Sequence, residues 1–421
     1  MSDSFLIKGG NLLRGDVHVS GSKNAALKLI AATLLTDRPC KLTNVPILKD
    51  VEVMFDILRS IGSDINQRGR TVYISNKNIK PSTLDYKLVG KVRGSVVIMG
   101  PLLSRFGSVV MPYPGGDKIG RRPLSFHFNL FRDLGFSVKE SEKNFTISKS
   151  KKMPQVSKVI LDGFSVTATE TALMWAAGQE REIEFSTVAE EPHIQNLVEM
   201  LRRMGANIQV KPQNQIVIRG KKSLRGVDQR VIYDYIEAGT WVVAGLVVGG
   251  DIRICNFPTQ DLKLFLHRLK RIGANIEIIN PTTVRVKTSP NLKAFRMDVR
   301  IHPGIAADLQ SPLGVLGTQC NGTSEIFDTL YEGRLSYLKE LKKMGANVKI
   351  LDVHRAYITG PTKLKGIKFV KKEDIRGGMS LIIAGLVASG QTFIKDAYQV
   401  DRGYEKIDQK LFKLGANIQR I

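Results

Sequence analysis

Leu341–Ile350 reads LKKMGANVKI, and close variants of this stretch recur along the chain. Leu338, Leu341 and Met344 lie at helical spacing, which predicts an amphipathic helix. Gly345 then supplies the left-handed position at which helices commonly end. The alternating residues that follow predict a strand. The stretch therefore encodes one helix, one glycine stop and one strand.

The same unit occurs six times. The other copies begin at Leu58, Phe131, Leu201, Leu269 and Leu411. Their stop glycines are Gly62, Gly135, Gly205, Gly273 and Gly415, each about 70 residues from the next. A fixed period of this length indicates one supersecondary unit used repeatedly. We therefore expect six structural repeats.

Length and composition bound the class of protein. With 421 residues, 43% hydrophobic and 24% charged, the chain is typical of a soluble globular protein with two or three domains. The apolar runs, such as Ala238–Gly250, are too short to cross a bilayer. The N-terminal residues lack the apolar segment of a signal peptide. We expect a cytoplasmic protein without membrane insertion.

The net charge of +24 could indicate nucleic acid, acidic small substrates or scattered surface lysines. The lysines are dispersed and few aromatic residues lie among them, so we do not expect nucleic-acid binding. Cys40, Cys255 and Cys320 show no metal or disulfide spacing, and the six histidines form no HxH or HxxxH motif. A bound metal is therefore not predicted, and the oligomeric state is left open.

The N-terminal residues look incomplete by themselves. The stretch from Phe5, FLIKGGNLLRGDVHV, parallels the stretch from Ile216 that closes the third repeat. The sixth repeat stops at Ile421 without such an ending, so the N-terminal strands should complete it. This predicts one domain over 21–232, and a second domain over 1–20 and 233–421.

Each repeat also begins with a helix that is apolar nearly all round, for example Ala238–Val248 and Met379–Ala388. Such a helix should be buried, with sheets outside it. Alternation of helices and strands favours α/β packing. We therefore predict two inside-out α/β domains, each of three repeats with buried helices and outer sheets, and an active site in the cleft between them.

Charged residues at the starts of the buried helices suggest an anion site. Lys23 and Arg93 stand where the helix dipole disfavours cations, a conflict that a bound anion would remove. Asn24, Thr169 and Asp308 could instead be ordinary helix caps. The loop Pro114–Pro123, PGGDKIGRRP, joins two glycines to a carboxylate and several cations, which is typical of a functional lid.

Several motifs together resemble the enolpyruvyl transferases, and within them the branch whose acceptor is UDP-N-acetylglucosamine. The resemblance covers essentially the whole chain. It rests on SGSKNAAL from Ser20, VRGSVVIMGPLLSRFG from Val92, PGGDKIGRRP from Pro114, SVTATE from Ser165, IEAGTW from Ile236, PGIAADLQ from Pro303, YEGRL from Tyr331 and DRGYEKI from Asp401. The family fold implied is the two-domain arrangement predicted above.

The resemblance implies transfer of the enolpyruvyl group of phosphoenolpyruvate to the 3-hydroxyl of UDP-N-acetylglucosamine in peptidoglycan synthesis, with no cofactor. It implies that Lys23, Arg122 and Arg402 hold phosphoenolpyruvate, with Arg93 and Arg376 nearby. Asn24 would position the reacting groups, Asp308 would be the base, and Asp117 would be the acid. The substrate-binding residues implied further are Pro123, Leu124, Ser125, Phe126, Ser165, Val166, Leu330, Arg334 and Asp374.

The chain departs from the family pattern at three positions. Asp117 stands where the lid usually carries cysteine, the thiol that fosfomycin-type epoxides alkylate, so resistance to such epoxides is expected. A carboxyl group is ordinarily ionised at pH 7 whereas a thiol keeps its proton, so activity should rise below neutral pH. Thr167 replaces a glycine, and His193 replaces an acid.

Two other functions remain as alternatives. A sister enzyme of the same fold uses shikimate 3-phosphate as the acceptor, and the lid sequence argues against it. A catalytically inactive basic paralogue would be a binding protein, and the presence of both Asp117 and Asp308 argues against that. Release of phosphate that depends on the acceptor discriminates among the three.

Overall fold

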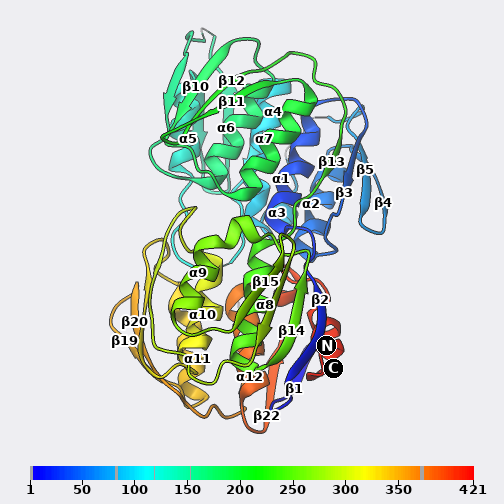
Figure 1. The fold of residues 1–421 in the computed structure, drawn as a ribbon. Helices are drawn as coiled ribbons and strands as arrows, with labels where there is room; N and C mark the ends of the chain where they lie inside the picture. Colours follow the sequence, from blue (N-terminus) through cyan, green and yellow to red (C-terminus); the bar gives the residue numbers. More distant parts are fainter. Residues whose placement is uncertain (1–2, 81–83, 118, 152, 370–373) are drawn as a thin grey trace. The chain divides into compact units, whose positions relative to one another are not determined.

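The computed structural model describes residues 3–80, 84–117, 119–151, 153–369 and 374–421 (Figure 1). Contacts divide the chain into two compact units. The terminal unit comprises Met1–Ser20, Asp117–Arg121 and Tyr233–Ile421. The inserted unit comprises Gly21–Gly116 and Arg122–Ile232. No helix in these ranges is long and apolar enough to cross a membrane.

The repeat is visible in the backbone at its stop glycines. Gly62, Gly205 and Gly345 have φ values of 101°, 117° and 93°, and the other three stop glycines are also left-handed. A side chain is strained in this region, whereas glycine is not. The predicted ends of the six helices are therefore confirmed.

The inserted unit has buried helices α1, α4 and α6. Helix α6 packs against α4, and α1 packs against the 3₁₀ helix η2 that leads into α4. Its helices are α1 (Lys23–Ala32), η1 (Thr33–Leu35), α2 (Lys49–Ser60), α3 (Tyr86–Val89), η2 (Arg93–Ile98), α4 (Met99–Phe106), α5 (Ser125–Asp133), α6 (Val166–Ala177) and α7 (Pro192–Met204).

Three sheets belong to the inserted unit, in the orders β13-β3-β5-β4, β6-β8-β7 and β11-β12-β10-β9. Their strands are β3 (Cys40–Thr43), β4 (Asp64–Arg68), β5 (Thr71–Ser75), β6 (Ser108–Pro112), β7 (Phe136–Glu140), β8 (Asn144–Lys149), β9 (Lys158–Ile160), β10 (Glu182–Ser186), β11 (Asn207–Lys211), β12 (Gln215–Arg219) and β13 (Asp228–Arg230).

The terminal unit repeats this design with α8, α10 and α12, which pack against one another. Its helices are α8 (Tyr235–Val248), η3 (Thr259–Leu262), α9 (Lys263–Arg271), η4 (Ala307–Leu309), α10 (Gln310–Gly317), η5 (Arg334–Ser336), α11 (Tyr337–Lys343), α12 (Ile375–Val387), α13 (Tyr398–Asp401) and α14 (Ile407–Lys413). All residues of α8 except the last are buried. Buried helices with sheets outside them are thus confirmed.

Its sheets have the orders β21-β22-β1-β23, β15-β16-β14-β2 and β17-β18-β20-β19. The strands are β1 (Ser4–Lys8), β2 (Leu13–His18), β14 (Gly250–Cys255), β15 (Ile276–Asn280), β16 (Thr283–Lys287), β17 (Arg296–Val299), β18 (Gly322–Asp328), β19 (Asn347–Ile350), β20 (Arg355–Gly360), β21 (Lys368–Phe369), β22 (Gln391–Lys395) and β23 (Asn417–Arg420).

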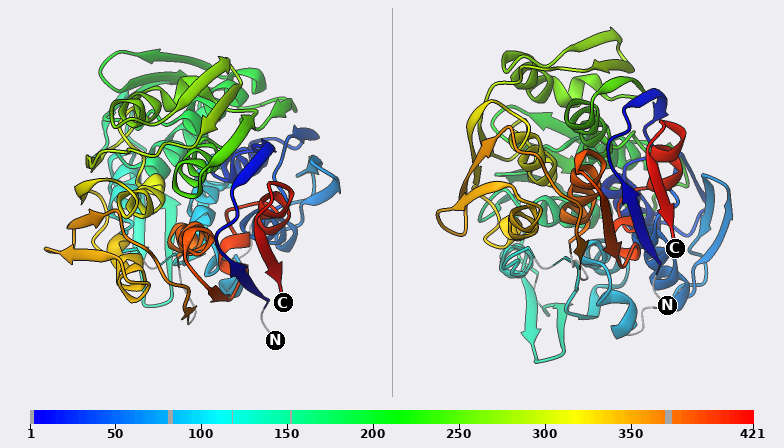
Figure 2. Two further views of the ribbon diagram at one scale, coloured as in Figure 1. Left: turned by 60° about the horizontal axis from the view of Figure 1, so that its bottom comes forward. Right: turned by 90° about the horizontal axis from the view of Figure 1, so that it is seen from below.

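The two ends of the chain meet in one sheet. Strand β1 lies between β22 and β23 and is antiparallel to both. Ser4 and Ile421 exchange two backbone hydrogen bonds, of 2.8 and 2.9 Å, and Figure 2 shows the first and last strands side by side. The N-terminal residues therefore supply a central strand of the sixth repeat, and β2 joins the sheet of the fourth repeat.

Candidate active site

Asp308 in the terminal unit is held by two buried arginines. Arg334 Nη2 lies 3.0 Å from Asp308 Oδ1, and Arg376 donates to Asp308 Oδ2 from Nη2 at 2.8 Å and Nε at 3.0 Å. The arginine side chains are 3% and 2% exposed, whereas the Asp308 side chain is 25% exposed. Two cations therefore fix this carboxylate while part of it stays open to solvent.

The two arginines are themselves supported. The guanidinium groups of Arg334 and Arg376 lie 5.0 Å from the ring centroids of Tyr331 and Tyr404 respectively, in cation–π geometry. Burial opposes the charge of Arg376, but the neighbouring Asp308 raises its pKa well above the ordinary value. Both cations therefore keep their charge inside the unit.

Asp374 has a structural role in this cluster. Its carboxylate accepts hydrogen bonds from the backbone N–H groups of Arg376 and Gly377, at 3.3 and 2.9 Å, and so caps α12. Its Oδ1 also lies 3.8 Å from Arg334 Nη1. Burial raises the pKa of Asp374, Arg334 opposes that shift, and Asp117 adds to it.

Asp117 and Arg402 are paired in the terminal unit. Arg402 follows the short helix α13, and its Nη1 lies 2.5 Å from Asp117 Oδ1 and 3.0 Å from Gln399 Oε1. The side chains of Arg402 and Asp117 are 8% and 14% exposed. Two residues that the sequence analysis singled out separately thus form one pair, 285 positions apart in the chain. Lys118 lies outside the described residues.

Lys23 and Asn24 begin α1 in the inserted unit. The helix is capped by Ser22, whose side chain accepts from the backbone N–H of Ala25 at 3.3 Å. Lys23 Nζ lies 3.6 Å from Asp50 Oδ2, and both side chains are largely buried. A cation at a helix N-terminus is unfavourable unless an anion is near it, and Asp50 is such an anion.

Arg93 contacts backbone oxygens at both ends of the Pro114–Pro123 loop. Its guanidinium donates to the carbonyl oxygen of Arg122, and approaches those of Pro114 and Pro123 at 3.5 Å each. A Cβ added to Gly116 would lie 2.9 Å from Arg93 Cβ and 3.3 Å from Arg122 Nη2. Arg93 therefore fixes the base of the loop and brings Arg122 beside Gly116.

The predicted UDP-sugar residues of the inserted unit cluster around two helix starts. Pro123 and Leu124 precede α5, and Ser125 and Phe126 begin it. Ser165 directly precedes α6, and Val166 begins it. A Cβ added to Gly163 would lie 3.1 Å from the Phe126 ring, so the two helix starts are neighbours. Ser165 caps α6, accepting from Ala168 N at 3.3 Å. Leu330 lies in the terminal unit and is exposed.

The alternative reading of Asn24, Thr169 and Asp308 as helix caps is wrong. The caps with side-chain hydrogen bonds are Ser22 for α1 and Ser165 for α6, whereas η4, which contains Asp308, begins after Ala306 without one. Thr169 instead accepts from Ala189 N at 3.0 Å. The Asp308 carboxylate therefore accepts from Arg334 and Arg376 and does not cap a helix.

Comparison with known proteins agrees with this architecture. The family model described as EPSP synthase (3-phosphoshikimate 1-carboxyvinyltransferase) matches residues 7–411. The chain belongs to the EPSP synthase family of enolpyruvyl transferases. A UDP-N-acetylglucosamine 1-carboxyvinyltransferase 1 of Clostridium acetobutylicum is 38% identical over all of both chains. A UDP-N-acetylglucosamine 1-carboxyvinyltransferase of Borreliella burgdorferi is 36% identical over 99% of each.

Solved structures show the same fold. The enolpyruvyl transferase NikO of Streptomyces tendae has a TM-score of 0.89 at 24% identity, covering 100% of this chain and 99% of its own. EPSP synthase of Acinetobacter baumannii has a TM-score of 0.77 at 19% identity, over 100% of both chains. The two-domain α/β fold of the enolpyruvyl transferases is therefore confirmed.

Sequence reasoning missed some partners in this enolpyruvyl transferase. Asp50 is an ordinary acidic residue in the first turn of α2, and nothing in its sequence context links it to Lys23. Gln399 likewise gives no signal of its contact with Arg402. Glu332 stands inside the YEGRL motif that carried the resemblance, so its position, though not its role, could have been singled out.

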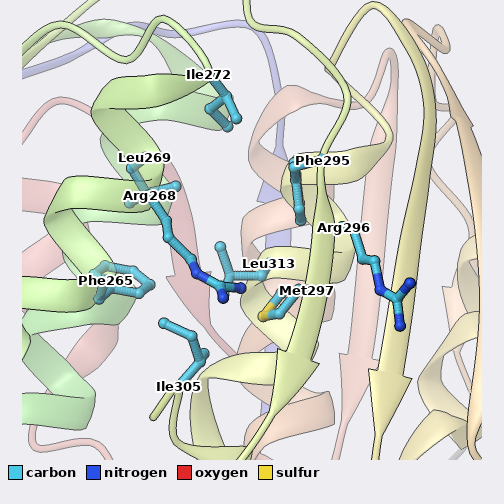
Figure 3. Close-up of a pocket in the computed structure, with 9 residues that line it drawn as sticks. All are labelled: Phe265, Arg268, Leu269, Ile272, Phe295, Arg296, Met297, Ile305 and Leu313. Carbon is cyan, nitrogen blue, oxygen red and sulfur yellow. The ribbon is translucent and has the colours of Figure 1, made fainter. Parts of the chain in front are cut away.

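A small pocket lies elsewhere in the terminal unit (Figure 3). It is partly open to solvent and lies among apolar side chains of α9, β17 and α10, including Phe265, Met297 and Leu313. Arg268 points into it. None of the predicted substrate residues lines this pocket. Among the described residues, no group of three or more metal-ligating side chains is gathered that could hold a metal ion.

The core of the inserted unit contains a buried ionic group. Lys28 Nζ lies 2.9 Å from Glu170 Oε2, and His193 Nε2 lies 3.6 Å from Glu170 Oε1. Burial raises the pKa of Glu170 to about 7, although Lys28 opposes this shift. His127 is also buried, and burial together with the charge of Arg93 lowers its pKa to about 3.

Glu170 should therefore make stability depend on pH. Between its ordinary pKa of 4.5 and about 7, the folded state holds a proton that the unfolded chain has lost. The free energy of unfolding should thus fall as pH rises through this window, by at most about 1.4 kcal/mol per pH unit. His127 has the opposite effect below pH 6.5, where the unfolded chain binds a proton at His127 that the folded state does not bind. His127 therefore lowers the free energy of unfolding as pH falls.

The substitution Glu170→Gln should remove the contribution of Glu170 alone. Thermal unfolding from pH 5 to 8 should give a difference between native and variant protein that changes with pH below 7 and levels off above it. Glu199→Gln, an exposed residue beside Arg203, is the matched control. A constant difference across the range would contradict the shifted pKa of Glu170.

Proposed function

We propose that the chain transfers the enolpyruvyl group of phosphoenolpyruvate to the 3-hydroxyl of UDP-N-acetylglucosamine and releases phosphate. The observation that carries this proposal is the similarity of 36–38% over essentially whole chains to relatives that bear this activity in their names. The EPSP synthase structure, by contrast, is 19% identical. UDP-N-acetylglucosamine is therefore a better-supported acceptor than shikimate 3-phosphate.

The cations suit phosphoenolpyruvate, which carries both a phosphate and a carboxylate. Lys23 and Arg122 of the inserted unit and Arg402 of the terminal unit would bind it, assisted by Arg93 and Arg376. Charge-assisted hydrogen bonds are the strong ones. Lys23 and Arg402 have carboxylate partners, Asp50 and Asp117, so the substrate would share these cations with the two carboxylates or displace them.

Asp308 would be the general base. Each of its oxygens is directed by one arginine, yet a carboxylate has about four acceptor positions, so it can also accept the proton of the sugar hydroxyl. The sugar oxygen then forms a bond to C2 of phosphoenolpyruvate. Asn24 would position the reacting groups.

Asp117 would be the general acid. Its proton goes to the methylene carbon C3, and C2 becomes the cationic carbon that the sugar oxygen attacks. In the tetrahedral adduct the bond between C2 and the phosphate oxygen then breaks, a proton returns from C3 to the Asp117 carboxylate, and the proton held by Asp308 leaves with the phosphate. The products are the enolpyruvyl ether and phosphate, so the balance requires no redox partner.

The remaining substrate contacts are proposed from the same motifs. Pro123, Leu124, Ser125, Phe126, Ser165, Val166 and Leu330 would bind the nucleotide sugar. Arg334 and Asp374, which hold Asp308 and cap α12, would also contact the substrate. We further propose that the reaction serves peptidoglycan synthesis, hence cell shape and division, in the cytoplasm. Because the proposed contact residues belong to both units, substitutions in either unit should lower the rate of the same reaction.

The direct test is a phosphate-release assay. Phosphate should appear from phosphoenolpyruvate only when UDP-N-acetylglucosamine is added, and the nucleotide-sugar product should gain the mass of one enolpyruvyl group. Addition of shikimate 3-phosphate should give the background rate. Release that depends on shikimate 3-phosphate would overturn the choice of acceptor, and no release with either acceptor would support the inactive paralogue.

A further inference from the structure

The described residues of the short segment 117–121, Asp117 and 119–121, belong to the terminal unit, although the residues on both sides of the segment belong to the inserted unit. Two backbone groups make the attachment. The N–H of Gly333 donates to the carbonyl oxygen of Ile119 at 3.0 Å. The N–H of Arg121 donates to Glu332 Oε2 at 3.1 Å. The side chain of Ile119 is buried, with 4% exposure.

The fit between the segment and the turn is close. A Cβ added to Gly333 would lie 2.8 Å from the carbonyl carbon of Ile119 and 3.0 Å from Gly120 N. The φ of Gly333 is −98°, which any residue adopts, so the neighbouring segment is what excludes a side chain there. Gly120, whose φ is 128°, lies against Glu332, so a side chain at Gly120 would also meet the turn.

The Glu332 carboxylate is suited to hold a backbone amide. The N–H groups of Glu332 itself and of Arg121 lower its pKa below the ordinary value. The side chain is exposed, so its charge alone contributes little to stability. Its role is to orient the backbone, because Glu332 Oε2, which accepts from the Arg121 N–H, fixes the path of the chain at Arg121.

We propose that Glu332 and Gly333 are positioning residues that hold 117–121 so that the carboxyl group of Asp117 meets Arg402. Asp117 lies at the start of the segment, with Oδ1 2.5 Å from Arg402 Nη1. The consequence for catalysis rests on the proposed function, in which Asp117 is the acid. The next residue, Arg334, holds Asp308, so one turn orients both proposed proton-transfer groups.

Hydrogen exchange tests the attachment without reference to activity. In Gly333→Ala the new methyl group should displace the segment, and in Glu332→Ala the acceptor is lost. Exchange at the Arg121 amide should become at least about tenfold faster in both variants. Glu332→Gln keeps an acceptor oxygen and should retain most of the protection. Glu277→Ala, an exposed glutamate near Lys287, should change nothing there.

Turnover provides the second readout. In Glu332→Ala and Gly333→Ala, kcat should fall about tenfold while KM for UDP-N-acetylglucosamine changes little, because the substitution disturbs the acid rather than substrate binding. Glu332→Gln should recover most of kcat, and unfolding temperatures should match the native value.

Three results would contradict different parts of the proposal. Unchanged exchange at Arg121 in both alanine variants would overturn the attachment. Faster exchange with native kcat would overturn the positioning role. If the native protein itself showed no turnover with any acceptor, the proposed function would fail, and the exchange data would still decide whether Glu332 and Gly333 hold the segment.

Discussion

Replacing Asp308 by asparagine is expected to lower kcat by about 10²- to 10⁴-fold, the usual contribution of a positioned general base. An amide cannot take the proton of the sugar hydroxyl. It keeps the shape of the carboxylate and one acceptor oxygen, so one of Arg334 and Arg376 can remain hydrogen-bonded. Binding of UDP-N-acetylglucosamine, measured by calorimetry, should be weakened far less than turnover.

The structural effect of this substitution needs its own control, because removing one partner of a buried ion pair commonly costs about 3–5 kcal/mol. Thermal unfolding of Asp308→Asn should therefore be measured beside turnover. Asp298→Asn is a matched variant, since Asp298 also lies beside two arginines, but Arg296 and Arg300 are exposed whereas Arg334 and Arg376 are buried. It should retain native kcat. Near-native turnover of a folded Asp308→Asn enzyme would rule out Asp308 as the base.

The second large effect is expected at Asp117. The native enzyme should resist fosfomycin-type epoxides, because a carboxylate is a much poorer nucleophile toward them than a thiolate. Asp117→Cys should become sensitive, gaining the mass of one epoxide in step with loss of activity. Because a thiol holds its proton at higher pH than a carboxyl group, the pH optimum of the variant should also move upward.

The native cysteines should react little with the epoxide. Cys40 and Cys320 are buried, and burial raises the pKa of Cys320 to about 12. Cys255 is half-buried, and burial raises its pKa as well. Asp117→Ser is the matched control and should gain no mass. Native protein that is inactivated as readily as Asp117→Cys would show that Asp117 is not the residue at the lid position.

The sequence was informative where local chemistry repeats. The left-handed glycines at Gly62 and Gly345 could be read from their spacing, because only glycine tolerates that backbone without strain. The partnership of β1 with the sixth repeat could be read from the likeness of the Phe5 and Ile216 stretches. Local propensity and periodicity are sufficient for such features.

Contacts between distant residues could not be read in this way. The pair Asp117–Arg402 and the pair Lys23–Asp50 depend on how whole repeats pack, and neither residue type nor spacing announces them. The resemblance implied Asp374 as a substrate contact, and its capping of α12 was not predicted. The motif resemblance supplied the names of site residues, whereas the partners of those residues come from the structure.

The meeting of Ser4 with Ile421 has a consequence for biosynthesis. A ribosome releases the chain from its N-terminus, so the inserted unit can be complete while the terminal unit still waits for its last strand. Until β23 emerges, β1 has an open edge, and such edges are templates for association with other chains. Because β23 closes this edge, the final residues should be decisive for the yield of folded protein.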